Sequence, residues 1–437
     1  MATFSYHHLL IFTLVAVTSA APSFRPKALV LPVSKDPSKL QYTINLTQRT
    51  PPVSVPLTLH LGGSYLWVDC DRNYVSSTYR PAQCNSAQCS LADSKSCGTC
   101  NSPPRPGCNN DTCGLTPDNP ITNTATGGEL ASDVVQLPST DGSNPGRVVS
   151  VPNFLFTCGP TFLLQGLAKG VQGIAGLGRT KISLPSQFSS TFSFARKFAI
   201  CLSASTNLNG VVFFGDGPYR LLHSPQSIDV SSSLMYTPLI INPVSTAAAS
   251  FAGEPSSEYF IGVTAIKIGE KEVPLNKYKA LLTIDNKGNG GTKISTVNPY
   301  TVMHTSIYKA VTNFFVNELK NVSRVKAVAP FQVCYDMKSL PSTRVGAGVP
   351  AIDLVLQNEK VYWRMFGANS MVAVNGDVIC LGFLDGGENV RTAIVIGGYQ
   401  MEDNLLQFDL ARSRLGFSSS LLFSQTTCAN FNFTSSA

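Results

Sequence analysis

The chain has 437 residues, a formal net charge of +7 and only 14% charged residues. Its Lys and Arg residues are scattered and do not cluster with aromatic residues, which argues against a nucleic-acid-binding protein. The charge favours an acidic polysaccharide or an acidic protein as partner, or equally a solvated surface with no particular partner. A chain of this length is too long for one hydrophobic core, so we expect two lobes.

The N-terminus predicts a secretory signal peptide over residues 1–20. His7 and His8 give a weakly basic start, residues 9–17 form an apolar run, and small residues follow at 18–21. The run is too short to cross a bilayer, and no later stretch reaches the roughly 20 apolar residues that spanning requires. We therefore expect a secreted, extracellular protein with no membrane segment.

Short apolar runs bounded by turn residues follow along the chain. Residues 64–68, 210–214 and 394–396 are typical examples and are rich in Val, Ile, Phe and Thr. This pattern predicts a mostly β protein. One segment, residues 305–321, has helical spacing instead, and Ser306 is its expected N-cap.

Twelve cysteines, an even number, predict a disulfide framework formed in an oxidising compartment. The alternative is a zinc site at the CxxC spacing of residues 97–100, but no histidine lies near it, so we expect no metal and no cofactor. Order alone leaves the pairing of the first eight cysteines open, whereas for the last four we expect the pairs 334–380 and 201–428. The twelve are Cys70, Cys84, Cys89, Cys97, Cys100, Cys108, Cys113, Cys158, Cys201, Cys334, Cys380 and Cys428.

Four N-linked glycosylation sequons also favour an exported protein. A sequon of this kind marks a surface loop when the chain is secreted, although each alone is a weak signal. The four acceptors are Asn45, Asn110, Asn321 and Asn432.

A similar pattern occurs once in each half of the chain. Residues 57–63 form an apolar strand that ends in a tight turn, and residues 173–178 form a second apolar strand that ends in glycines. Residues 291–297 and 393–398 repeat this arrangement at a similar separation. An internal duplication with a pseudo-twofold axis is the simplest account.

Together with residues 66–70, 179–187, 258–263 and 396–417, these repeats resemble the two lobes of the pepsin-like aspartic proteases, in their plant, cysteine-rich branch. The resemblance spans nearly the whole mature chain. It implies a mostly β, bilobal pepsin-like fold with two pseudo-symmetric β-rich lobes. The N-terminal lobe is expected over residues 21–225 and the C-terminal lobe over residues 226–437.

Residues 69–71, 73–81, 298–301 and 426–431 resemble a narrower group within that family. It comprises the plant extracellular glycoproteins that inhibit xyloglucan-specific endoglucanases, with the related xylanase inhibitors and basic 7S globulins. The resemblance implies a monomer in the apoplast that takes part in plant defence and binds a microbial xyloglucan-specific endoglucanase.

The two catalytic positions of an aspartic protease are altered. Those enzymes need two carboxylates that share one proton, each in an Asp-Thr/Ser-Gly motif. Here the motifs begin with His60 and Ser295, so we expect no peptidase activity. Leu61 also lacks the usual bracing hydroxyl, and Val297 replaces a glycine that would allow a tight turn.

The flap tyrosine of these proteases is missing too. No tyrosine occurs between Tyr79 and Tyr219, and residues 123–130 are our candidate for the flap.

A serine hydrolase is a further alternative at the lobe junction. If the fold is kept, His60 and Ser295 should lie close together, as a base and a nucleophile would. Only Asp69 and Asp71 are candidates to orient the histidine, and no oxyanion hole is evident. We therefore favour two relics of a lost dyad.

The resemblance also implies where an inhibitor would touch its target. Members of the inhibitor group place two basic side chains, from separate loops of the C-terminal lobe, into the cleft of the enzyme. The first position matches Arg344, and the second matches Gln425, which brings no charge. An ordinary solvated arginine is the alternative for Arg344.

Two other functions compete with that of an inhibitor. One is an active secreted aspartic peptidase, and the other is a storage or peptide-binding protein like the basic 7S globulins.

Overall fold

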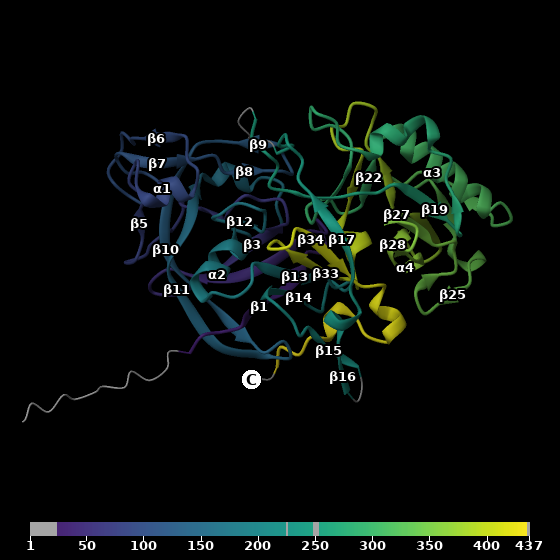
Figure 1. Ribbon diagram of the computed structural model, residues 1–437, viewed down its shortest axis with the longest axis horizontal. Helices are drawn as coiled ribbons and strands as arrows, with labels where there is room; N and C mark the ends of the chain where they lie inside the picture. The colour runs from purple at the N-terminus through teal and green to yellow at the C-terminus, as the bar shows by residue number, and fades with distance from the viewer. Residues whose placement is uncertain (1–23, 224–225, 248–252, 435–437) are drawn as a thin grey trace, which may run out of the picture.

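The structure, a computed structural model, describes residues 24–223, 226–247 and 253–434. Two β-rich lobes lie side by side, the first drawn in purple to blue and the second in green to yellow (Figure 1). The predicted fold class, mostly β and bilobal, is confirmed. The predicted signal peptide at residues 1–20 lies outside the described residues, and no described helix is long and apolar enough to cross a membrane.

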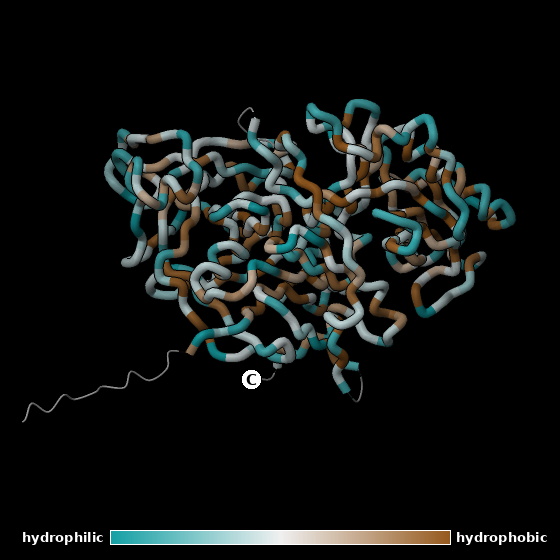
Figure 2. Tube along the Cα trace, viewed as in Figure 1, coloured by the Kyte–Doolittle hydropathy of each residue, from teal (hydrophilic) through white to brown (hydrophobic). Residues whose placement is uncertain are grey.

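One continuous antiparallel run of six strands joins the two lobes. It pairs β1 with β14, β14 with β13, β13 with β33, β33 with β34, and β34 with β17. The strands carry mostly buried apolar side chains, and hydrophobic segments run through this central region in Figure 2. Their bounds are Ala28–Lys35 (β1), Gly210–Gly215 (β14), Lys197–Cys201 (β13), Leu405–Asp409 (β33), Arg414–Phe417 (β34) and Met235–Ile240 (β17).

In each lobe, a strand that ends at the junction between the lobes pairs with a parallel strand. In the first lobe β3 (Val53–His60) runs parallel to β12 (Gly173–Gly176). In the second lobe β21 (Thr292–Ile294) runs parallel to β32 (Ile394–Ile396). These are the four segments of the sequence repeat, so the expected internal duplication agrees with the topology.

The remaining strands complete the two lobes. In the first lobe they are Tyr42–Gln48 (β2), Trp67–Asp69 (β4), Arg80–Pro81 (β5), Ser96–Gly98 (β6), Thr112–Leu115 (β7), Asp118–Asn119 (β8), Thr124–Ala125 (β9), Gly128–Thr140 (β10) and Pro145–Gly159 (β11). Between the lobes lie Arg220–His223 (β15) and Gln226–Asp229 (β16). In the second lobe they are Tyr259–Ile261 (β18), Ala265–Ile268 (β19), Lys271–Glu272 (β20), Thr301–Met303 (β22), Arg324–Val325 (β23), Cys334–Asp336 (β24), Ser342–Thr343 (β25), Gly346–Ala347 (β26), Ile352–Asn358 (β27), Val361–Met365 (β28), Met371–Ala373 (β29), Val378–Leu381 (β30) and Phe383–Asp385 (β31).

Helices are short, apart from α3 (Thr305–Glu318). The sequence predicted this helix over residues 305–321 with Ser306 as N-cap, and that cap assignment was wrong. The N-cap is His304, because its ring Nδ1 accepts a hydrogen bond from the Ser306 N–H at 3.1 Å. The other α-helices are Ala87–Leu91 (α1), Leu184–Phe192 (α2), Gly367–Ser370 (α4) and Gly398–Met401 (α5).

All twelve cysteines form disulfides. Cys201 pairs with Cys428 and Cys334 with Cys380, which confirms both predicted pairs. The former ties the C-terminal segment to β13 of the central sheet. The two cysteines of the CxxC spacing are also oxidised, so neither is a thiolate available to zinc. The other four pairs are Cys70–Cys158, Cys84–Cys97, Cys89–Cys113 and Cys100–Cys108.

The buried hydroxyl of Thr296, in the second lobe, braces the end of β3 at the junction. Thr296 Oγ1 donates to the carbonyl of Leu59 at 2.7 Å and accepts from the N–H of Leu61 at 3.1 Å. Leu61 has no hydroxyl to return the contact, so the brace acts from one side only. Two backbone groups at the end of β3 therefore depend on Thr296.

We predict that Thr296→Val lowers the free energy of unfolding by about 1–3 kcal/mol, because the buried N–H of Leu61 loses its partner. Urea denaturation followed by fluorescence measures this difference. Thr58→Val is the matched control, since the Thr58 hydroxyl is also buried but has no hydrogen-bond partner among the described residues. That control should change stability little or raise it, and equal losses in both variants would contradict the assigned brace.

Candidate functional site

A groove with a volume of about 890 Å³ lies at the junction and is lined by both lobes. His60, at the end of β3, and Ser295, directly after β21, both line it. The structure therefore brings the two altered catalytic positions to one cavity, as expected if the fold is kept. The segment that precedes β18 closes the groove beside them, with Ser257 Oγ donating to the carbonyl of Gly62 at 2.7 Å.

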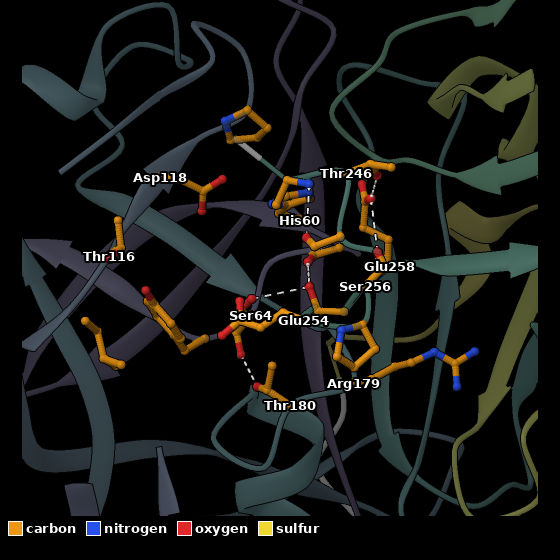
Figure 3. Close-up of a pocket in the computed structure, with 18 of the residues that line it drawn as sticks. His60, Ser64, Thr116, Asp118, Arg179, Thr180, Thr246, Glu254, Ser256 and Glu258 are labelled. Carbon is orange, nitrogen blue, oxygen red and sulfur yellow. Dashed lines mark hydrogen bonds between the residues drawn. The ribbon is translucent and has the colours of Figure 1, made fainter. Parts of the chain in front are cut away.

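His60 is a neutral, buried imidazole over most of the pH range. Its side chain lies near Glu258 in the groove (Figure 3), and the residue is only 7% exposed. Burial lowers the pKa of His60 to about 4; the negative charge of Glu258 opposes this shift and the positive charge of Lys293 adds to it. The imidazole has no positive charge above that pH with which to attract an anion.

Ser295 is bonded within its own turn. Its Oγ donates to Asn298 Oδ1 at 2.8 Å and accepts from the N–H groups of Val297 and Asn298 at 3.3 and 3.4 Å. Within the described ranges, no hydrogen bond joins Ser295 to His60, although an activated serine needs a base within such reach. The Val297 backbone does not have a positive φ, so the turn accommodates the β-branched side chain without the strain that its sequence suggested.

The two aspartates considered as orienting groups point elsewhere. Asp69 accepts from the hydroxyl of Thr161 at 2.9 Å, and Asp71 forms an ion pair with Arg105 at 3.5 Å. Neither lines the groove. The geometry therefore lacks both the contact and the third group of a Ser–His hydrolase.

Sequence analysis missed the acidic groups of the groove. Glu258 forms an ion pair with Lys293 at 2.7 Å and accepts a hydrogen bond from the Thr246 hydroxyl. Burial raises the pKa of Glu258, but these contacts outweigh it and hold the pKa below its usual value. Burial, and then the charge of Glu258, raise the pKa of Asp118 to about 6.

These two carboxylates do not form a proton-sharing dyad. In Figure 3 the ring of His60 lies between Asp118 and Glu258. No hydrogen bond connects the two carboxylates in the part of the chain that the structure describes, and Lys293 already neutralises Glu258. A dyad needs two carboxyl groups that share one proton, and the ion pair with Lys293 keeps Glu258 from that role.

The expected flap at residues 123–130 is only partly correct. The hairpin of β8 and β9, Asp118 to Ala125, is the segment that lines the groove, through Asp118, Pro120 and Asn123. Its turn is set by Asn119, whose Oδ1 accepts from the N–H of Ile121 at 2.8 Å. The rest of the expected segment leads into β10, which begins at Gly128.

Arg344 and Gln425 lie apart from the groove, on the C-terminal lobe. Arg344 is exposed in the turn between β25 and β26, and its guanidinium has no hydrogen bond or ion pair to any described residue. Gln425 is exposed after a 3₁₀ turn, Leu421–Ser424 (η5), and has a φ of 52°. Neither lines the groove.

The four predicted glycan acceptors differ in exposure. Asn45, Asn110 and Asn321 are exposed, and Asn432 is half-buried. Their glycosylation stays a prediction.

We predict that His60→Asn changes the pH dependence of stability. The unfolded chain protonates this histidine below about pH 6.5, whereas the folded chain resists protonation down to about pH 4. The unfolded state thus binds more protons in this window, and the wild type loses up to about 3 kcal/mol relative to the variant as the pH falls through it. Urea denaturation at several pH values measures the difference.

Asp118→Asn is the control, because its stability difference from the wild type should change with pH in the opposite direction. Its carboxyl has a raised pKa when folded, so the wild type loses stability relative to this variant as the pH rises from about 4 past about 6. A stability difference between wild type and His60→Asn that does not vary with pH would contradict the assigned environment of His60.

Comparisons with known proteins agree on one family. The family models described as "Xylanase inhibitor N-terminal" and "Xylanase inhibitor C-terminal" match residues 42–216 and 258–419. A relative named "Probable aspartic proteinase GIP2" from Nicotiana benthamiana is 66% identical over 99% of this chain and 98% of its own. The structure described as "Crystal structure of edgp" is 62% identical, has a TM-score of 0.92, and is matched over 95% of this chain and 100% of that chain. Soybean basic 7S globulin is 38% identical, with a TM-score of 0.81 over 94% of this chain and 99% of that chain. The chain therefore belongs to the xylanase inhibitor family, whose members have a pepsin-like, aspartic-protease-related fold.

Proposed function

We propose that this chain is a secreted, proteolytically inactive family member that binds and inhibits a microbial xyloglucan-specific endo-β-1,4-glucanase. It acts as a monomer in the plant apoplast, in defence. The observation that carries the proposal is the free guanidinium of Arg344 at the tip of a rigid hairpin. The family description, an inhibitor of a glycoside hydrolase, supports the class of partner.

The hairpin that carries Arg344 is held by hydrogen bonds on both sides of its turn. Thr343 Oγ1 donates to the carbonyl of Gly346 at 2.7 Å, and the N–H of Ala368 in α4 donates to the carbonyl of Val345 at 2.7 Å. Gly346 has a φ of 93°, and a Cβ there would lie 2.1 Å from the backbone N of Ala368. A loop that is already ordered loses less conformational entropy when it binds, so more of its contact energy appears as affinity.

Arginine suits the cleft of a glycoside hydrolase. Such clefts hold two catalytic carboxylates, and the planar guanidinium can bind a carboxylate through two parallel hydrogen bonds. The net charge of +7 would also favour approach to an acidic cleft. Gln425 can donate a hydrogen bond to a carboxylate but adds no charge, so we assign it a weaker contact.

The groove supports the absence of peptidase activity. His60 is neutral and Ser295 is bonded within its own turn, so neither replaces a carboxylate that activates water. Glu258 is held by Lys293. An acid-pH assay with and without pepstatin tests this part of the proposal, and pepstatin-sensitive cleavage of a protein substrate would contradict it.

Storage or peptide binding is the second candidate, because the basic 7S globulin from soybean matches nearly the full length of the chain. Mixing purified protein with a fungal or oomycete xyloglucan-specific endoglucanase separates the two. Loss of xyloglucan hydrolysis favours the inhibitor, and unchanged hydrolysis over a wide range of inhibitor concentration favours the globulin-like role.

We predict that Arg344→Ala raises the inhibition constant against such an enzyme by at least about 30-fold, the effect of removing a central binding residue. The inhibition constant of Arg344→Lys should lie between those of the wild type and Arg344→Ala, since lysine keeps the charge but not the planar guanidinium. Arg72→Ala removes another exposed arginine, in the first lobe, and should leave inhibition unchanged. If Arg344→Ala inhibits as well as the wild type, the assignment of Arg344 fails.

We predict that Gln425→Arg lowers the inhibition constant by about tenfold, because it adds a second charge-assisted contact to the acidic cleft. Both residues have a Cβ, so the substitution adds no new strain at the positive φ. Gln88→Arg, on α1 of the first lobe, adds the same charge far from the hairpin and should have little effect. An equal gain in both variants would indicate a general charge effect and would remove the specific role of Gln425.

A further inference from the structure

We infer that Phe423 is the apolar anchor of a docking face that also contains Arg344 and Gln425, and that this face fits a cleft with carboxylates flanked by aromatic sugar-binding platforms. The inference rests on the proposed function and names the kind of surface that the target enzyme presents. Phe423 lies in η5, two residues before Gln425, and its side chain is 50% exposed. We call residues 341–348, Phe366 and residues 421–425 the inhibitor face.

A pair of aromatic rings connects the two loops of the inhibitor face. Phe423 meets Phe366 in an edge-to-face contact, with ring centroids 4.7 Å apart and planes at 72°. Phe366 is the N-cap of α4, and the N–H of Ala368, two residues later, donates the hydrogen bond that holds the Arg344 hairpin. A contact of this geometry contributes about 0.5–1.5 kcal/mol beyond simple burial. The aromatic pair therefore ties the position of η5 to that of the hairpin.

The η5 segment is fixed from its other side as well. The N–H of Leu421 donates to the carbonyl of Asp403 at 2.9 Å, and the N–H of Cys428 donates to the Asp403 carboxylate at 2.9 Å. The disulfide from Cys428 to Cys201 anchors the same segment to the central sheet. Phe423 is thus presented to solvent from a fixed backbone, which is the condition for an anchor that loses little entropy on binding.

The composition of the two loops that carry Arg344 and Phe423 favours an acidic partner. Residues 341–350 and 418–430 contain no Asp or Glu, while Arg344 projects from the first of these segments without an internal partner. A single exposed aromatic residue is ordinary on a protein surface. What distinguishes Phe423 is its link, through Phe366 and α4, to the hairpin of an unpaired arginine, in two loops that lack carboxylates.

A binding cleft for a β-glucan combines the features that this face complements. Its catalytic carboxylates would accept hydrogen bonds from the guanidinium, and the aromatic rings on which sugars stack would pack against Phe423. Contact between the apolar groups would exclude water from the ion pair, and an ion pair is stronger in a less polar environment. Phe423 would thereby strengthen the ion pair of Arg344 and would also bury apolar surface of its own on binding.

The test measures inhibition and association of Phe423→Ala with a xyloglucan-specific endoglucanase. We expect the inhibition constant to rise by about 10- to 100-fold, mainly through faster dissociation, with little change in the unfolding temperature. Phe423→Trp should keep most of the affinity. Phe162→Ala is the matched control, since Phe162 is 57% exposed in the first lobe and should not matter.

The outcomes separate this inference from the proposed function. If wild type inhibits, Arg344→Ala weakens inhibition and Phe423→Ala does not, the inference is wrong and the proposed function stands. If the wild type does not inhibit at all, the proposed function is wrong, and the inference that rests on it is wrong with it. A double variant of Arg344→Ala and Phe423→Ala should lose less than the product of the two single effects, because each residue strengthens the other. Strictly multiplicative losses would overturn the coupling.

Discussion

The antiparallel pairing of β13 with β33 joins the two lobes into one body, and the positions of both surfaces considered above depend on it. Phe198 of the first lobe stacks on Phe408 of the second, with centroids 4.7 Å apart, and Tyr259 packs against both rings. Main-chain hydrogen bonds and packing between buried aromatic rings therefore both stabilise the contact between the lobes at β13 and β33. The groove above this sheet and the inhibitor face on the C-terminal lobe are held in a fixed relation by it.

A groove remains at the place of a catalytic cleft, while the groups at its altered catalytic positions and the nearby Glu258 are neutral or paired internally. Lys293 neutralises Glu258, Ser295 closes its own turn, and His60 stays neutral because it is buried. A free carboxylate pair in this place would repel itself unless it shared a proton. Replacing that pair removes a source of electrostatic strain, and the fold retains the junction through the hydroxyl of Thr296.

Sequence reasoning succeeded where a pattern is local or repeated. The internal duplication around His60 and Ser295 was expected from the repeat and agrees with the topology. Two disulfides were also paired correctly, although Cys201 and Cys428 lie far apart in the chain. Sequence reasoning missed several side-chain contacts between distant segments. Lys293 reaches Glu258 because β21 pairs with β18 in one particular register, which no single segment reveals. His304 was missed as an N-cap because histidine is an uncommon acceptor there. The contact between Phe366 and Phe423 likewise depends on how two distant loops pack.

The central claim is that this chain engages a glycoside hydrolase through the inhibitor face and not through the groove. Hydrogen–deuterium exchange of the chain, alone and with a xyloglucan-specific endoglucanase, tests it most directly. The account predicts slower exchange of backbone amides in residues 341–348 and 421–427 on complex formation, with the β8–β9 hairpin unchanged. Protection confined to that hairpin and to the other segments that line the groove would contradict it.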